Sequence, residues 1–147
     1  MNAYLLIGGT HTRKSTLLRC LTGCFNRSLR DIELLRGGSV KLYARVAALQ
    51  ASRTEPAEFI AEVAATRCSD VALVLWPEAN PLDPKRYPDA QGYVEAFQAA
   101  GWKIAKVAVV GAHPLALKLP GLARFSNVLH QPINTSAQLI RSHFGWR

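Results

Sequence analysis

A short run of glycine, basic and hydroxyl residues near the start of the chain has the composition of a phosphate-binding loop. The run GGTHTRKST occupies residues 8–16 and follows a short apolar segment directly. Gly8 and Gly9 allow the backbone to turn sharply and to point its N–H groups inward, while Lys14 supplies a cation and Ser15 a hydroxyl group. We therefore expect a loop that binds the phosphate groups of a ligand.

The loop departs from the P-loop pattern at one position. That pattern is a glycine, four residues and then Gly-Lys-Ser or Gly-Lys-Thr, whereas here Arg13 stands before Lys14 and Ser15. The arginine either restricts the loop and plugs the site, or adds a second charge-assisted contact to the anion. Lys14 is expected to reach the β and γ phosphates and Ser15 to meet Mg²⁺. The expected nucleotide-binding residues are Gly8, Gly9, Thr10, His11, Thr12, Arg13, Lys14, Ser15 and Thr16.

The elements that position this loop alternate between apolar strands and amphipathic helices along the whole chain. The pattern predicts strands at 3–7, 39–49, 70–76, 105–110 and 127–131. It predicts helices at 15–21 with a stop at Gly23, from an N-cap at Thr54 through Ala64, at 90–100 and at 135–144. The weak, basic segment 24–38 is expected to be a loop with a short helix around 29–35.

Strands joined by helices of this length favour a parallel sheet with right-handed crossovers. We expect one α/β domain over residues 1–147, a three-layer sandwich with a mostly parallel sheet of about five strands and helices on both faces. Ligands of such sheets bind beyond the carboxyl ends of the strands. Residues 8–16 follow the first strand, so the expected fold places them where a ligand would bind.

By its first loop and the order of its elements, the chain resembles a small GTPase-like domain of the P-loop NTPase superfamily with degenerate motifs. The family's Asp-x-x-Gly motif would fall at 46–49, which here is Val-Ala-Ala-Leu. Its Asn-Lys-x-Asp motif would fall at 111–115, which here is Gly-Ala-His-Pro-Leu, so guanine specificity is not predicted. In an ATP-using relative the strand 70–76 would end in a Walker B aspartate, but it ends in Trp76.

Two polar residues are candidates for a part in hydrolysis. Gln50 falls where some members of the family have a water-positioning glutamine, and its alternative is a polar residue at a strand end. Glu78, two residues beyond Trp76, is a candidate for positioning a metal ion or water, and its alternative is a solvated loop carboxylate. Phosphoryl transfer needs positioned cations and an oriented nucleophile, so these departures predict weak or absent hydrolysis.

The composition limits the class of protein. Lys and Arg number 18 against 10 Asp and Glu, which gives a net charge of +8 and favours phosphate, nucleic acid or an acidic partner surface. The basic residues form no block, so a diffusely basic surface is favoured over dedicated nucleic-acid binding. No apolar run approaches the roughly 20 residues of a membrane span. Three cysteines, an odd number, argue for a reducing compartment, and we expect a cytoplasmic protein.

These observations favour a protein that binds ATP, GTP or another phosphate-bearing ligand and acts as a switch or scaffold. The alternative is a degenerate P-loop fold that recognises a protein or a nucleic acid without nucleotide. A small-molecule kinase is a further alternative, for which no lid or acceptor-site pattern is visible.

Overall fold

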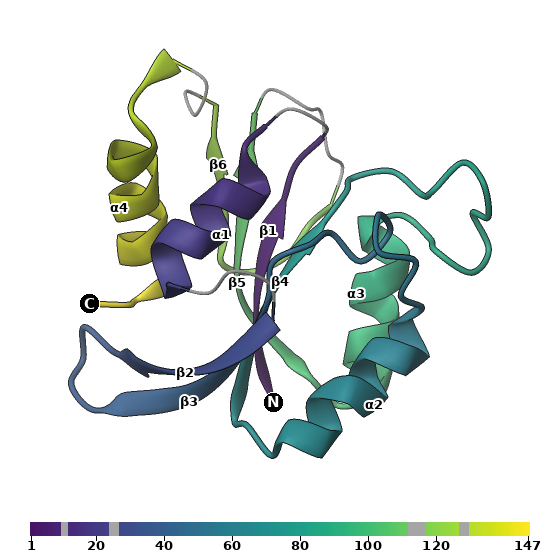
Figure 1. Cartoon of the computed structure of the whole chain (residues 1–147), viewed down its shortest axis with the longest axis horizontal. Helices are drawn as coiled ribbons and strands as arrows, with labels where there is room; N and C mark the ends of the chain where they lie inside the picture. Colours follow the sequence, from purple (N-terminus) through teal and green to yellow (C-terminus); the bar gives the residue numbers. More distant parts are fainter. Residues whose placement is uncertain (10–11, 24–26, 112–116, 127–129) are drawn as a thin grey trace.

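The computed structural model describes residues 1–9, 12–23, 27–111, 117–126 and 130–147. Within these ranges the chain forms an α/β fold with one six-stranded sheet and four helices (Figure 1). The strands are β1 (Asn2–Ile7), β2 (Arg27–Glu33), β3 (Ser39–Arg45), β4 (Asp70–Leu75), β5 (Lys103–Val110) and β6 (Leu122–Phe125). The helices are α1 (Lys14–Thr22), α2 (Pro56–Thr66), α3 (Ala90–Ala99) and α4 (Ile133–Phe144). None of these described helices is long and apolar enough to cross a membrane.

The sheet is mostly parallel, with the strand order β2-β3-β4-β1-β5-β6. Only the pair β2–β3 is antiparallel among these strands, and it joins Arg27 to Arg45 and Glu33 to Ser39. β2 corrects the expectation of a loop with a short helix at 29–35. An edge strand has a neighbour on one side only, so a strand that carries four charges in seven residues can form there without an apolar pattern.

The last strand also differs from the expectation. β6 occupies Leu122–Phe125 and pairs in parallel with β5, several residues before the predicted strand at 127–131. Residues 127–129 lie outside the described residues, and 130–131 are not part of a strand. Pro120 and Gly121 directly precede β6, so the last strand begins earlier than expected.

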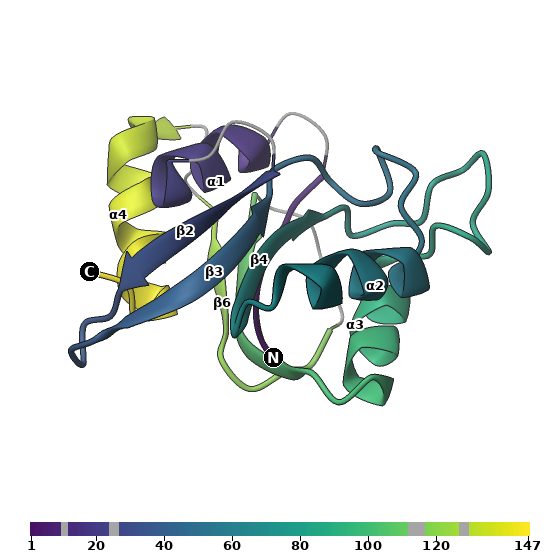
Figure 2. The same ribbon diagram turned by 60° about the horizontal axis from the view of Figure 1, so that its bottom comes forward.

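Helices cover both faces of the sheet (Figures 1 and 2). Successive residues of β1 point to opposite faces, and Leu6 therefore belongs to one core and Leu5 to the other. The first core lies under α1 and α4, and the second lies under α2 and α3. This arrangement confirms the expected α/β class with a mostly parallel sheet.

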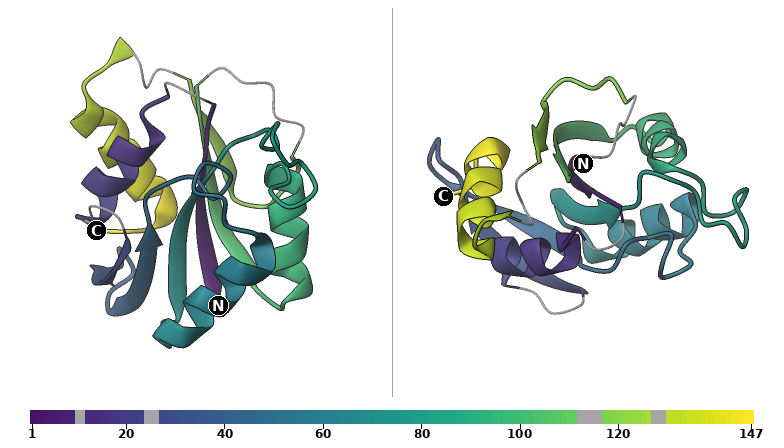
Figure 3. Two further views of the ribbon diagram at one scale, coloured as in Figure 1. Left: turned by 45° about the vertical axis from the view of Figure 1, so that its right-hand side comes forward. Right: turned by 90° about the horizontal axis from the view of Figure 1, so that it is seen from above.

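The connections leave β1 and β4 in opposite directions, although the two strands are neighbours. α1 leads from β1 toward the β2–β3 hairpin, whereas α3 leads from β4 across β1 to β5. The right-hand view of Figure 3 looks down on the sheet from the end where both strands finish. Ligands of open α/β sheets bind where the strand order reverses in this way. Gly8, the residue after β1, lies at that position.

Candidate functional site

Gly8 joins the end of β1 to the loop and cannot carry a side chain without displacing its neighbours. Its N–H donates to the carbonyl of Leu75 at 3.1 Å, which continues the pairing of β1 with β4. A Cβ atom at Gly8 would lie 2.6 Å from Cγ2 of Val110 and 2.5 Å from Oγ1 of Thr12. The close approach of the loop to β5 therefore requires glycine. A Cβ atom at Gly9 would meet no atom within 4 Å.

The loop closes on the carbonyl oxygen of Gly9. The hydroxyl of Thr12 donates to this oxygen at 2.7 Å, and the ammonium of Lys14 donates to it at 2.8 Å. Thr10 and His11, two of the expected ligand residues, lie outside the described residues. The second of these hydrogen bonds holds the ammonium group of Lys14 against the loop.

Lys14 is a buried cation that has no counter-ion among the residues that the structure describes. The residue is only 8% exposed, and burial lowers the pKa of its ammonium group. In the described part of the chain it forms no ion pair, and the carbonyl of Gly9 is its one hydrogen-bond partner. A desolvated ammonium group with a single neutral partner is unfavourable, and an anion at this position would compensate it.

Arg13 has the left-handed backbone conformation that glycine favours, with φ 63° and ψ 21°. An L-residue in this region costs about 1 kcal/mol relative to glycine, and the arginine adopts it nevertheless. The side chain is exposed and does not cap the helix, and the first turn of α1 contains no acidic residue. The N-terminus of α1 thus carries an uncompensated positive dipole with the cation of Arg13 beside it.

Ser15 contacts the segment that follows β3, and Thr16 is exposed. The hydroxyl of Ser15 donates to the carbonyl of Val46 at 3.1 Å, so the expected Asp-x-x-Gly position does lie beside Ser15. Val46 has an apolar, buried side chain, whereas Mg²⁺ is usually held by carboxylate oxygens. The described residues contain no cluster of three His, Cys, Asp or Glu side chains. The described residues beside Ser15 thus offer a backbone carbonyl, and the contact of Ser15 with Mg²⁺ stays a prediction.

Gln50 is fully buried and has a structural role. Its amide nitrogen donates to the carbonyls of Trp76 and Pro88, and its amide oxygen accepts from the N–H of Trp76. Asn80 in turn donates to the carbonyl of Gln50 at 3.0 Å. These contacts fix the loop between β4 and α3 and account for Gln50 without a water-positioning role. Glu78 is exposed in the same loop.

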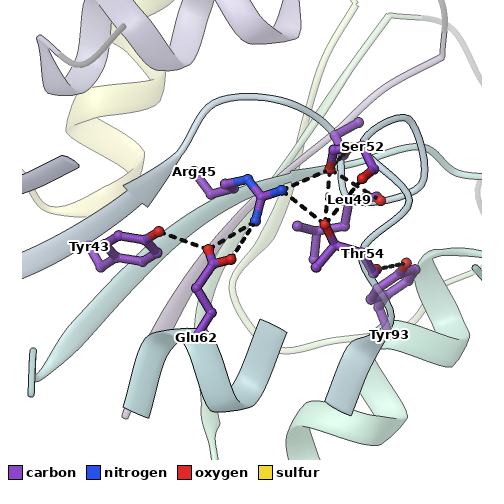
Figure 4. Close-up of polar contacts among 8 residues, drawn as sticks. Tyr43, Arg45, Leu49, Ser52, Thr54, Glu62 and Tyr93 are labelled. Atoms are coloured by element: carbon purple, nitrogen blue, oxygen red, sulfur yellow. Dashed lines mark hydrogen bonds and ion pairs between the residues drawn. The ribbon is translucent and has the colours of Figure 1, made fainter. Parts of the chain in front are cut away.

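A second buried cation, Arg45 at the end of β3, was not among the candidates from the sequence. One guanidinium nitrogen donates to both carboxylate oxygens of Glu62, at 2.9 and 3.0 Å (Figure 4). The other donates to the hydroxyl groups of Ser52 and Thr54, at 3.1 and 2.9 Å. Tyr43 also donates to Glu62, at 2.8 Å.

This cluster corrects two expectations. β3 ends at Arg45 rather than at 49, and α2 covers the buried side chain of Arg45. The N-cap of α2 is Glu55 rather than Thr54, because the hydroxyl of Thr54 accepts from Arg45. No spacing in the sequence connects Arg45 to Glu62, so only the tertiary packing reveals their contact.

The comparisons with known proteins add no family. No family model, curated protein or solved structure is significantly similar to the chain.

Proposed function

We propose that this protein binds a nucleoside triphosphate, or another ligand with a chain of phosphates, through residues 8–16 of a degenerate P-loop. The observation that carries the proposal is the buried ammonium group of Lys14, which lacks a counter-ion among the described residues. A phosphate oxygen near this group would supply the missing negative charge. It would also raise the lowered pKa of the lysine toward its ordinary value.

The N-terminus of α1 supports an anion at the same place. The side chain of its N-cap residue, Arg13, makes no capping hydrogen bond, and the helix dipole favours a negative charge beyond the first turn. Arg13 is exposed rather than folded into the loop, which favours a phosphate contact over a plugged site. Lys14 and Arg13 would thus act on neighbouring phosphates of one ligand.

The architecture is compatible with the three-layer sandwich of P-loop NTPases. The loop follows the first strand, a helix begins directly after it, and the two form part of a sheet with helices on both faces. The finer assignment to a GTPase-like domain remains part of the proposal. No described feature selects between adenine and guanine.

Hydrolysis would be weak or absent in this account. Val46 rather than a carboxylate lies beside Ser15, Gln50 is engaged by backbone groups, and Glu78 is exposed in the β4–α3 loop. A triphosphate held without an oriented nucleophile is bound rather than turned over. The protein would then act as a switch or scaffold.

Titration calorimetry with ATP, GTP and tripolyphosphate, each with and without Mg²⁺, tests the proposal. We expect saturable binding that Lys14→Met weakens by at least about tenfold, the effect of one charge-assisted contact. Lys41→Met removes an exposed lysine of β3 as a matched control and should leave the affinity unchanged. Equal affinity for the three compounds would indicate recognition of phosphate alone.

The alternative is an interaction module without nucleotide, and one observation favours it. The loop 77–88 is held in place through Gln50 and Asn80, and it exposes Leu82 to 77%. An ordered loop that presents a large apolar side chain is a feature of recognition surfaces. The absence of binding in every calorimetric titration would favour this alternative.

A further inference from the structure

A cavity of about 360 Å³ lies at the amino ends of the parallel strands, whereas the phosphate-binding loop lies at their carboxyl ends. Its walls come from the amino ends of β1, β4 and β5, from the turn after β2 and from the end of α4. The last residues of the chain close one side, since Leu35 donates to the carbonyl of Gly145 and Arg147 donates to the carbonyl of Glu33. The volume is within the range of small-molecule sites.

Asp70, the first residue of β4, places a buried carboxylate in this cavity. It is 1% exposed and accepts a hydrogen bond from the hydroxyl of Ser69 at 2.6 Å, and the hydroxyl of Tyr4 interacts with it as well. No cation lies within ion-pair distance of this carboxylate among the described residues. A buried carboxylate without a cationic partner is costly, so a ligand with a positively charged donor would compensate it.

Tyr4 adds a hydroxyl group beside Asp70. The side chain is buried against Phe144 and Trp146, with ring centroids 5.4 and 5.0 Å away. Burial raises the pKa of the Tyr4 hydroxyl, and the negative charge of Asp70 raises it further. The hydroxyl therefore stays protonated, so it can donate to Asp70 while its oxygen accepts a hydrogen bond from a ligand.

Three basic side chains line the same cavity. Arg36 comes from the turn after β2, and Lys103 and Lys106 come from β5. None of the three forms an ion pair within the described part of the chain. Arg36 and Lys103 are exposed, so they can move to meet a ligand at modest cost.

An irregularity in the pairing of β1 with β5 brings Lys106 into this arrangement. The register shifts between Ala3 and Tyr4, so that Ala3 pairs with Ile104 but Tyr4 pairs with Lys106. Such a bulge redirects the side chains of the strand that contains it. It sets a lysine directly beside the strand position that carries the buried hydroxyl.

We infer that this cavity binds a small zwitterion that carries an ammonium group and a carboxylate group, as a free amino acid does. The ammonium group would contact Asp70 and the hydroxyl of Tyr4, and the carboxylate would contact Lys103, Lys106 and Arg36. Each charge of such a ligand finds the opposite charge in the cavity. The site is separate from the phosphate-binding loop, because Asn2 and Gly8 are six residues apart on β1, or about 20 Å.

Amide chemical-shift titrations test the inference with L-alanine and L-glutamate as probes and with their halves, propionate and ethylammonium, as controls. We expect at least one amino acid to shift the amides of Tyr4, Ala105 and Lys106 with a dissociation constant of about 1 mM or tighter. Each half should bind at least about tenfold more weakly, because it forms only one of the two charged contacts. Propionate that binds as tightly as L-alanine would overturn the inference.

Two variants separate the charged contacts. Asp70→Asn should weaken binding of the amino acid at least about tenfold, and so should the double variant Lys103→Met, Lys106→Met. The double variant changes residues that are not fully buried and keeps the test valid if Asp70→Asn fails to fold. Lys14→Met should leave this affinity unchanged, which distinguishes the site from the phosphate-binding loop. The inference is wrong if no amino acid shifts these amides at about 10 mM, or if neither variant weakens binding.

Discussion

Two buried cations near the carboxyl ends of the strands differ in how the protein satisfies them. Arg45 is 7% exposed and meets the carboxylate of Glu62 and two hydroxyl groups (Figure 4). Lys14 is 8% exposed, and its one hydrogen-bond partner among the described residues is the carbonyl of Gly9. Burial of a cation is therefore not in itself a sign of function. The sign is a buried charge that the chain leaves uncompensated, because such a charge is stabilised when a ligand binds.

The two cations also differ in what they contribute to, since the contacts of Arg45 support the fold and those of Lys14 support ligand binding. The Arg45 cluster joins β3 to α2 through Glu62, and Thr54 extends it to α3 by accepting at its carbonyl from the hydroxyl of Tyr93, at 2.6 Å. Its loss should weaken the fold. The contacts of Lys14 lie within one loop, so its loss should affect the ligand more than the fold.

Glu62→Gln would remove the counter-charge of Arg45, so that Arg45, like Lys14, would be a buried cation with neutral partners. Of the variants proposed, we expect this one to have the largest effect on stability. The substitution leaves a buried guanidinium without its counter-charge and should lower the free energy of unfolding by about 3 kcal/mol. Urea denaturation measures the change, and Glu95→Gln on the exposed side of α3 serves as the control, with a change within about 0.5 kcal/mol. A loss for Glu62→Gln no larger than that of the control would contradict the structural role of the cluster.

Gly8→Ala tests the packing that holds Lys14 in its loop. The added methyl group would overlap Val110 and Thr12, so we expect a loss of about 1–3 kcal/mol in stability. Gly9→Ala is the matched control, because its Cβ meets open space, and it should be neutral within about 0.5 kcal/mol. Thermal or urea unfolding compares the two variants. Equal stability of both would mean that the loop does not approach β5 as closely as described.

Arg13→Gly should change stability and binding in opposite directions. Relief of the left-handed conformation should raise the free energy of unfolding by up to about 1 kcal/mol. Loss of the exposed guanidinium should weaken tripolyphosphate binding severalfold, since it removes one charge-assisted contact. Urea denaturation and calorimetry on the same sample measure both quantities. Tighter binding by the variant would show instead that the arginine plugs the site.

The pH dependence of Lys14 gives the smallest expected effect. Its native pKa is lowered from 10.5, so between the native pKa and 10.5 the unfolded chain binds more protons than the native one. Stability then rises with pH in this window, because the cost of burying the charge disappears as the amine loses its proton. Measurement of Lys14→Met in parallel separates the contribution of Lys14 to the pH dependence of stability from that of the buried tyrosines. Relative to Lys14→Met, the free energy of unfolding of the natural chain should rise as the pH rises toward 10.5. A relative fall over this range would contradict the account.

Much of the fold could be predicted from apolar runs. The strands near 3–7, 70–76 and 105–110 are central and buried on both faces, so their composition alone indicated them. β2 could not be found this way, because an edge strand needs no apolar pattern and its partner is fixed by tertiary pairing. The position of β4 between β3 and β1 could not be predicted either, because it depends on long-range packing.

The candidate site was predictable in part. The spacing of Gly8 and Lys14 indicated a loop after the first strand, and the structure places both there. The left-handed conformation of Arg13 and the burial of Lys14 depend on contacts that no local pattern encodes. Gln50 illustrates the converse, since its position in the sequence suggested a role in chemistry but its contacts are those of a structural residue.

The pKa of Lys14, measured with and without tripolyphosphate, tests the central claim most directly. A titration of the lysine ¹³Cε signals by NMR measures it, and the spectrum of Lys14→Met identifies the signal that belongs to this residue. The account predicts a pKa below 10.5 in the free protein and a clear rise when tripolyphosphate is added, because a phosphate then stabilises the charged form. An ordinary pKa in the free protein, or a lowered pKa that tripolyphosphate leaves unchanged, would contradict it.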